Sequence, residues 1–185
     1  MPLPQTFNDF IPSEKLAHEY RNVWENPANR DYQRYQQITR LFTNHNAALI
    51  DRCDIIYMAY DHFHRNRVQD AAACIASINN YIQRVQNGDL SLIAEMRASC
   101  GNVFSVMFCH HTCTDKYFGF TRPVREMLVK LNNRDHFYNN VFTEAELRDY
   151  PTFHVVMQQL KSHYHLKNVP NLELDIMLRL GNNLN

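Results

Sequence analysis

The chain has 185 residues, 45% of them hydrophobic and 21% charged, and its 19 basic residues balance its 19 acidic residues. Because the formal net charge is zero, the molecule as a whole has no attraction for nucleic acid or anionic membrane, and such binding would need a local patch. Only four residues are glycine, too few for a hairpin-rich fold or for the glycine-rich loops that cradle phosphates. We therefore expect an all-α protein, and the length fits a single domain.

The first twelve residues contain three prolines, no basic residue and no long apolar run. We expect them to form an extended arm ahead of a single helical domain, residues 13–185. With no secretory signal, no apolar run of about 18 to 20 residues and an odd number of cysteines, the chain is expected inside a cell, in cytoplasm or nucleus, and not in a membrane. The arm carries apolar side chains that can contact a neighbouring molecule: Phe7, Phe10 and Ile11.

Between residues 13 and 88, apolar residues recur three and four positions apart, which is the spacing of amphipathic helices. Asn26-Pro27 should end the first helix, and Gly88 should end the fourth in a left-handed conformation. The four predicted helices begin at Ser13-Glu14, near Asp31, near Ala47 and at Asp70.

The next helix is expected to be the most hydrophobic of the chain, with Asp89 as its cap. Its apolar residues keep the helical spacing from Ile93 to His111, so we predict one continuous helix over residues 89–113 with Gly101 inside it. Its second half is apolar on nearly all sides, which predicts a central helix with neighbours around it.

Local signals predict the helices that follow. Pro123 fits the first turn of one helix. Thr143 and Glu146 form a capping box for a short helix that ends at Tyr150-Pro151. A helical stripe of apolar residues then runs over residues 153–164.

The C-terminal tail has two interpretations. Over residues 170–181 apolar and mostly polar residues alternate as in a strand, but a helical stripe is also present and Gly181 would end it. We favour the helix, which makes the fold a multi-helix bundle of about seven to nine helices.

The densest group of possible metal ligands is Cys109-His110-His111-Thr112-Cys113. Two thiolates four residues apart on a helix can bind one zinc ion, so Cys109 and Cys113 are the candidate ligands. A complete site would need two more ligands, and the candidates are His62, His64, His136, His163 and His165. The chain lacks the CxxC pairs of the usual zinc modules, and the alternative is reduced structural cysteines without a cofactor.

Residues 116–134 combine aromatic side chains with five basic residues and a single acid, Glu126. Such a mixture can neutralise phosphates and stack on bases, so nucleic acid is one candidate partner. The residues that would bind it are Lys116, Arg122, Arg125 and Lys130. A protein partner is the second interpretation, and its contacts would be Tyr117, Phe118 and Phe120. In the third, these aromatic rings fill the core beside a solvated basic helix face.

The sequence contains no HExxH, GxSxG or CxxC motif, so no metalloprotease, hydrolase or thiol-redox site is predicted. We expect a non-enzymatic interaction protein, such as an adaptor, a regulator or an assembly subunit. The abundance of aromatic residues (12%), the zero net charge and the apolar arm favour self-association into a homo-oligomer. A nucleic-acid-binding protein and a zinc-binding protein are the alternatives.

Overall fold

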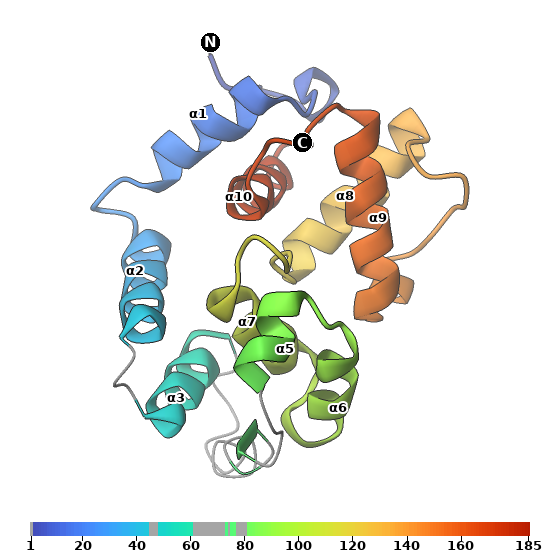
Figure 1. Ribbon diagram of the computed structural model, residues 1–185. Coiled ribbons are helices and arrows are strands. Elements are labelled where there is room, and N and C mark those ends of the chain that lie inside the picture. Colours follow the sequence, from blue (N-terminus) through green and yellow to red (C-terminus); the bar gives the residue numbers. More distant parts are fainter. Residues whose placement is uncertain (1, 45–47, 61–72, 74, 77–80) are drawn as a thin grey trace. The chain divides into compact units, whose positions relative to one another are not determined.

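The computed structural model describes residues 2–44, 48–60, 73, 75–76 and 81–185 (Figure 1). Within these residues nine α-helices and two short 3-10 helices have defined bounds, and no strand occurs, which confirms the all-helical prediction. Among the helices described, none has both the length and the apolar character that a bilayer crossing requires. The helices are α1 (Glu14–Trp24), α2 (Arg30–Thr43), α3 (Leu49–Tyr60), α5 (Tyr81–Asn87), α6 (Ser91–Cys100), α7 (Asn102–Thr112), α8 (Arg122–Asp135), α9 (Tyr150–His163) and α10 (Asn171–Gly181), with η1 (Phe7–Asp9) and η2 (Glu146–Arg148).

The chain divides into two compact units. Unit 1 contains both ends of the chain, Met1–Asn26 and Phe118–Asn185, and unit 2 is the continuous segment Pro27–Tyr117. The expectation of a single domain over residues 13–185 stays a prediction, and each unit is described by itself.

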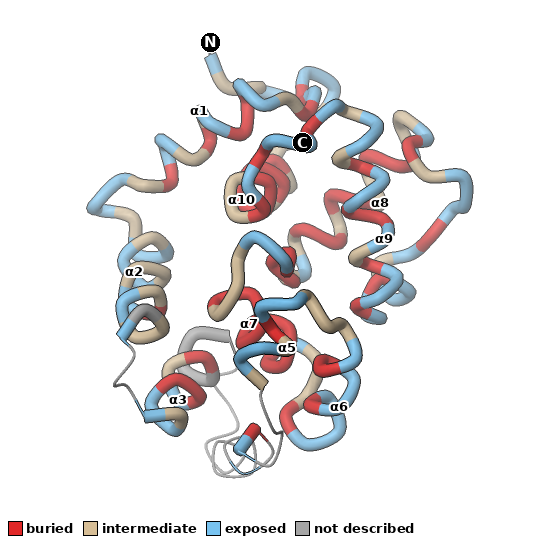
Figure 2. Tube along the Cα trace, viewed as in Figure 1, coloured by how far each residue is buried: buried red, intermediate tan, exposed pale blue. Residues whose placement is uncertain are grey.

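In unit 1, α10 packs against both α1 and α8. The ends of its helices follow local signals: the Ser13 hydroxyl accepts a hydrogen bond from the Leu16 amide (3.2 Å), and Pro123 lies in the first turn of α8. The C-terminal tail forms the helix α10, which is the interpretation that we favoured for residues 170–181 from their apolar stripe. The inward faces of these helices are apolar and buried (Figure 2), and they include Trp24, Met127, Leu128, Met157, Leu174 and Met177.

In unit 2, α7 is the central helix, and α2, α3, α5 and α6 all pack against it. Its side chains are buried without interruption from Phe104 to His111 (Figure 2), as the all-round apolar sequence predicted. Gly88, with a φ of 74°, ends α5 in the predicted left-handed conformation.

The predicted continuous helix over residues 89–113 is wrong, because α6 ends at Cys100 and α7 begins at Asn102. Between them Gly101 adopts φ 77° and ψ 160°, a conformation that is open essentially to glycine alone. The break lets α6 and α7 pack against one another. An unbroken helix would have kept the two apolar stripes in line and apart.

A second correction concerns Tyr150-Pro151, where the short helix was expected to end. The capping box forms as predicted, because the Thr143 amide donates to Glu146 Oε2 (2.7 Å) and the Glu146 amide donates to Thr143 Oγ1 (3.3 Å). It starts only the single turn η2, and Tyr150 instead begins α9. The Asp149 carboxylate caps α9 by accepting from the Thr152 amide (3.2 Å), and Pro151 is tolerated in the first turn because its missing N–H would have no partner there.

The predicted third helix agrees with α3 as far as Tyr60, and its expected continuation to residue 65 lies outside the described residues. The predicted fourth helix, from Asp70 to Asn87, lies outside them at residues 70–72, 74 and 77–80. Its final turns are described as α5.

Candidate interaction site

Residues 7–10 lie against unit 1 close to the other end of the chain. η1 closes a single turn, in which the Phe10 amide donates to the Phe7 carbonyl (3.1 Å). The Phe7 amide donates to the carbonyl of Asn185 (3.0 Å), so the last residue of the chain binds the N-terminal segment directly. The segment was predicted as an arm for intermolecular contact, and here it is seated on its own unit.

Arg134, at the end of α8, fastens this segment through its main chain. Its Nη1 donates to the Phe7 carbonyl (2.7 Å) and its Nη2 to the Phe10 carbonyl (2.8 Å). The guanidinium carbon also lies 4.7 Å from the centre of the Phe7 ring, a favourable distance for a cation–π contact. One side chain thus binds two carbonyls and a ring of the segment.

The guanidinium of Arg134 is held in position by its neighbour Asp135. Two ion-pair contacts join them, at 2.7 Å from Nε and 2.6 Å from Nη2, and the Tyr164 hydroxyl of α9 donates to the same carboxylate. Burial opposes ionisation of Asp135, but the hydrogen bonds from Arg134 and Tyr164 outweigh it, so the pKa of Asp135 is lowered. The carboxylate stays charged at neutral pH and orients the arginine.

Phe10 fills a slot whose floor is the backbone of Gly181. The Phe10 side chain is fully buried, and its ring lies 6.1 Å from that of Tyr20. A Cβ atom on Gly181 would lie 2.8 Å from Phe10 Cζ, closer than carbon atoms approach, so the slot needs glycine there. We call Phe7, Phe10, Arg134 and Gly181 the N-terminal clasp.

The three residues proposed for the arm therefore have different environments. Phe10 is buried in its own unit, and Phe7 is partly covered by Arg134 and by Lys130, whose Nζ is 6.0 Å from the Phe7 ring centre. Ile11 is 65% exposed and is the one of the three that presents an apolar side chain to solvent.

The aromatic residues of the segment 116–134 are buried. The Tyr117 hydroxyl donates to the Asp89 carbonyl (3.3 Å), and its own carbonyl is 2.8 Å from His110 Nδ1, all within unit 2. Phe118 and Phe120 are buried in unit 1. These three rings fill cores and offer no exposed surface to a partner, as in the third interpretation of this segment, although the basic helix face of that interpretation is not solvated at Arg125.

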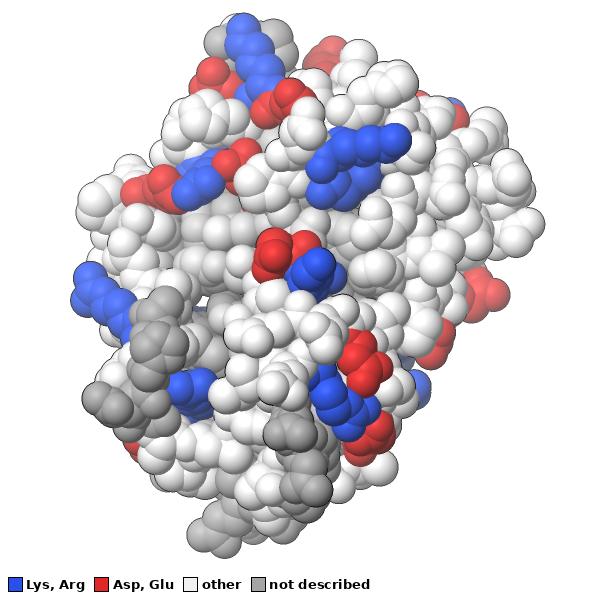
Figure 3. Space-filling model, viewed as in Figure 1, with Lys and Arg blue, Asp and Glu red and all other residues white. Residues whose placement is uncertain are grey.

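The basic residues of the same segment bind other groups of the chain. Arg125 is buried, pairs with Glu144 (2.7 Å) and stacks over Phe120 at 4.5 Å. Arg122 pairs with Glu126 (2.7 Å). Lys130 donates to the carbonyl of Asn182 (3.1 Å), whereas Lys116 belongs to unit 2 and is exposed. Figure 3 shows one face of the molecule, on which Lys and Arg side chains are scattered among Asp and Glu rather than gathered in one field.

The two candidate zinc ligands are protonated thiols at neutral pH. Cys109 is fully buried, which raises its pKa to about 12. The Cys113 thiol donates to Asp115 Oδ1 (3.0 Å), and burial together with that carboxylate raises its pKa to about 11. Zinc binds the thiolate, so both residues would first have to lose a proton.

No three His, Cys, Asp or Glu side chains gather at metal-binding distance within the part of the chain that the structure describes. Three of the histidines considered as further ligands, at positions 136, 163 and 165, belong to unit 1, whereas both thiols belong to unit 2. The other two, His62 and His64, lie outside the described residues.

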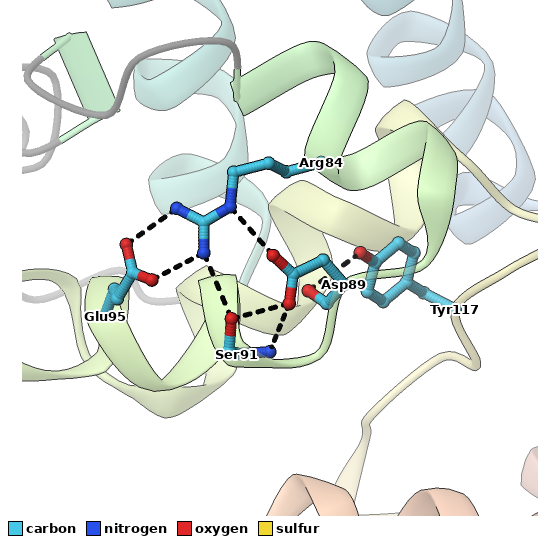
Figure 4. Close-up of polar contacts among 5 residues, drawn as sticks. All are labelled: Arg84, Asp89, Ser91, Glu95 and Tyr117. Carbon is cyan, nitrogen blue, oxygen red and sulfur yellow. Dashed lines mark hydrogen bonds and ion pairs between the residues drawn. The ribbon is translucent and has the colours of Figure 1, made fainter.

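Sequence reasoning missed a polar network at the corner between α5 and α6 (Figure 4). Arg84 Nε donates to Asp89 Oδ2 (2.8 Å), and its Nη1 donates to Glu95 Oε2 (2.8 Å). Asp89 Oδ1 accepts from the Ser91 amide (2.9 Å), so this carboxylate binds the first residue of α6, although the N-cap position is Leu90 and not Asp89 as predicted. The available signal was the Asn87-Gly88 turn, which folds the chain back between Arg84 and its acidic partners. The network holds the chain at the corner between α5 and α6, and the Arg84 guanidinium is paired with the carboxylates of Asp89 and Glu95.

Comparisons of the chain with family models, with curated proteins and with solved structures give no match.

Proposed function

We propose that this protein is a non-enzymatic interaction module that associates with copies of itself. The observation that carries the proposal is the pair of neighbours Phe10 and Ile11: the first is fully buried in the N-terminal clasp, and the second is 65% exposed beside it. Covering the exposed Ile11 side chain with a second molecule would bury apolar surface directly beside a fixed anchor, which favours association.

Two further features support self-association. The formal net charge of zero removes the long-range repulsion that keeps highly charged copies apart. In addition, the charged residues of the clasp and of α8 are engaged in contacts that hold unit 1 together, as Arg134 is with Asp135 and Arg125 with Glu144. These contacts give the groups a structural role.

Nucleic-acid binding through Lys116, Arg122, Arg125 and Lys130 has less support, because the last three are bound to other groups of unit 1.

We also propose an intracellular location, in cytoplasm or nucleus. It is supported by the free thiols of Cys53, Cys100, Cys109 and Cys113.

The test is a sedimentation-velocity series on the whole chain from about 1 to 100 μM at 150 mM salt. We expect the mean mass to rise above the monomer mass of 21.9 kDa with concentration. Ile11→Asp should reduce that rise, since a charge resists burial in an interface. The matched control is Val141→Asp, at an apolar residue of unit 1 that is 83% exposed, and it should leave the series unchanged. A mass that stays at the monomer value throughout would refute self-association.

A further inference from the structure

We infer that the N-terminal clasp is an exchange site, in which residues 7–10 of one copy bind Arg134 and Gly181 of a second copy. The inference rests on the proposed self-association and names the residues that perform it. Residues 7–10 are bound as a short peptide would be. The Phe10 ring fills the slot at Gly181, the Phe7 ring lies under the Arg134 guanidinium, and both carbonyls accept from Arg134.

None of these contacts needs the segment to come from the same molecule. The groups that bind it are Arg134, Gly181, Asn185 and Tyr20, and the segment joins the rest of the chain only through residues 11–13. An identical segment from a second copy would make the same hydrogen bonds and fill the same slot. This equivalence is the condition for exchange of an element between identical chains.

The connection can turn without unfolding a helix. Phe10 (φ −81°, ψ 98°) and Ser13 (φ −154°, ψ 158°) are both extended, and α1 begins only at Glu14. The cap of α1 is the Ser13 hydroxyl, which stays with the helix when the residues before it rotate. Opening therefore breaks the clasp contacts and exposes Pro12, which is buried in the closed form, and exchange can form the clasp contacts again.

Ile11 explains why the exchanged dimer should be favoured over the closed monomer as the concentration rises. In a single copy the tethered segment has a high effective concentration, so the closed form dominates in dilute solution. In an exchanged dimer the two connecting segments pass near one another, and each carries an Ile11 that is exposed in the closed form. Covering these side chains gives the dimer an apolar contact that the closed form lacks. The sequence Phe10-Ile11-Pro12-Ser13 is itself uncharged, and the nearest charges are those of Asp9 and Glu14 on either side of it.

The experiment uses two full-length variants that damage opposite halves of the clasp. Phe10→Ala removes the ring that seats and leaves the slot open. Gly181→Ala keeps the ring but places a methyl group 2.8 Å from where Phe10 Cζ would lie, which closes the slot. A copy of the second variant can still donate its segment to a copy of the first, so only the mixture contains a matched segment and slot.

We expect each variant alone to show at least tenfold less dimer than the unchanged chain, measured by native mass spectrometry on copies of distinct mass. Mixing the two variants should give a heterodimer whose population is at least tenfold above that of either homodimer. Trp24 emission, read on each variant alone, checks that unit 1 has folded, because Trp24 is buried there. If Gly181→Ala does not fold, Arg134→Gln replaces it, since the change removes charged donors to Phe7 and Phe10 without adding volume.

The outcomes separate this inference from the proposed function. If the unchanged chain is monomeric at every concentration, both fail. If it dimerises and the variants dimerise equally well alone, self-association stands and exchange at the clasp is refuted. If it dimerises but neither the variants nor their mixture do so, exchange is also refuted, because complementation is its specific consequence.

Discussion

In unit 1 charged side chains join segments that lie far apart in the sequence, whereas the ion pairs described in unit 2 are local. Arg134 reaches carbonyls 124 and 127 positions away, and Arg21 reaches Glu173 across 152 positions. In unit 2, Arg84 binds acids only five and eleven positions ahead. Unit 1 is assembled from the two ends of the chain and needs long-range ties, while unit 2 is one continuous segment that closes around the aromatic side chains of α7.

The chain carries an intrinsic probe for each unit. The single tryptophan, Trp24, belongs to unit 1, and all five cysteines belong to unit 2. Tryptophan emission therefore reports on unit 1, and the reactivity of the thiols reports on unit 2. The comparison can be tested by asking which probe responds to which substitution.

The largest effect is expected from Phe108→Ala, in the centre of α7. The Phe108 side chain is fully buried, and its ring lies 5.5 Å from that of Phe42 and 5.9 Å from that of Phe104. Its removal should lower the free energy of unfolding, read from thiol exposure in a guanidinium titration, by about 3–5 kcal/mol. The change read from Trp24 emission should be smaller.

Val103→Ala is the matched control for Phe108→Ala, because Val103 lies on the same helix and is exposed. It should change the free energy of unfolding by less than about 1 kcal/mol. If Phe108→Ala shifted both probes by the same amount, the two units would unfold together and the distinction between them would be structural only.

Arg134→Ala is expected to have the next largest effect, and to act on the Trp24 probe. The change leaves the carbonyls of Phe7 and Phe10 without their charged donor and leaves Asp135 without its ion-pair partner, with only the Tyr164 hydroxyl still donating to it. We expect a loss of about 2–3 kcal/mol in the free energy of unfolding of unit 1.

The control for Arg134 is Arg148→Ala, which removes a pair with Glu144 on a side chain that is 65% exposed. Surface pairs of this kind contribute about 0.2–1 kcal/mol, so the loss should be at most that. Equal losses for the two arginines would contradict the special role given to the clasp.

A third prediction uses pH. His111 lies between the rings of Tyr35 (5.2 Å) and Phe42 (5.9 Å), and burial, aided by His110, holds its pKa well below the ordinary 6.5. The unfolded chain then binds this proton more readily than the folded chain. The stability of unit 2 should be complete above pH 6.5 and fall below it by about 1.4 kcal/mol per pH unit until the folded-state pKa is reached.

Unit 1 should respond only to stronger acid, because the carboxyl groups of Asp135 and Glu144 have lowered pKa values there. Asp135 and Glu144 stabilise unit 1 while they are ionised, and this contribution is lost as the pH falls below about 4. Thiol exposure, measured with a disulfide reagent that reacts in acid, should therefore begin at a higher pH than the change in Trp24 emission. His111→Phe should remove this interval, and an unchanged profile in that variant would assign the acid sensitivity to another group.

The smallest effect is expected from Arg84→Ala at the corner of α5 and α6. Its partners Asp89 and Glu95 are local and partly exposed, so the loss should stay below about 1 kcal/mol, measured from thiol exposure. A loss as large as that of Arg134→Ala would remove the contrast between local and long-range ion pairs. Arg84→Lys, which keeps the charge but cannot bridge both acids in the same way, should lose less stability than Arg84→Ala.

Sequence reasoning succeeded where the deciding interaction is local. The Ser13 cap, the Gly88 stop, Pro123 in the first turn of α8 and the box of Thr143 with Glu146 all form as predicted. Each depends on groups within a few residues of one another. The prediction failed at Gly101, because a glycine inside a helical stripe can either continue or break the helix, and packing of α6 on α7 selects the break.

The candidate site was predicted less completely than the fold. The arm and the aromatic residues at 117–120 were predicted as contacts for a partner, but their exposure was not determined by composition. Phe10 is buried because Gly181, 171 positions later, leaves room for its ring. Arg134 was noted as one basic residue among five, and nothing near it in the sequence indicates that its partners are Phe7 and Phe10.

The amino-acid sequence by itself determined that this protein is helical and where most of its helices begin and end, because apolar spacing and caps act over three or four residues. Only the tertiary structure decided which apolar side chains are covered and which charges are paired. Those outcomes depend on residues more than a hundred positions apart, such as Arg134 and Phe7, that meet only when the chain has folded. For the same reason Ile11 is the arm residue left exposed, although all three looked alike in the sequence.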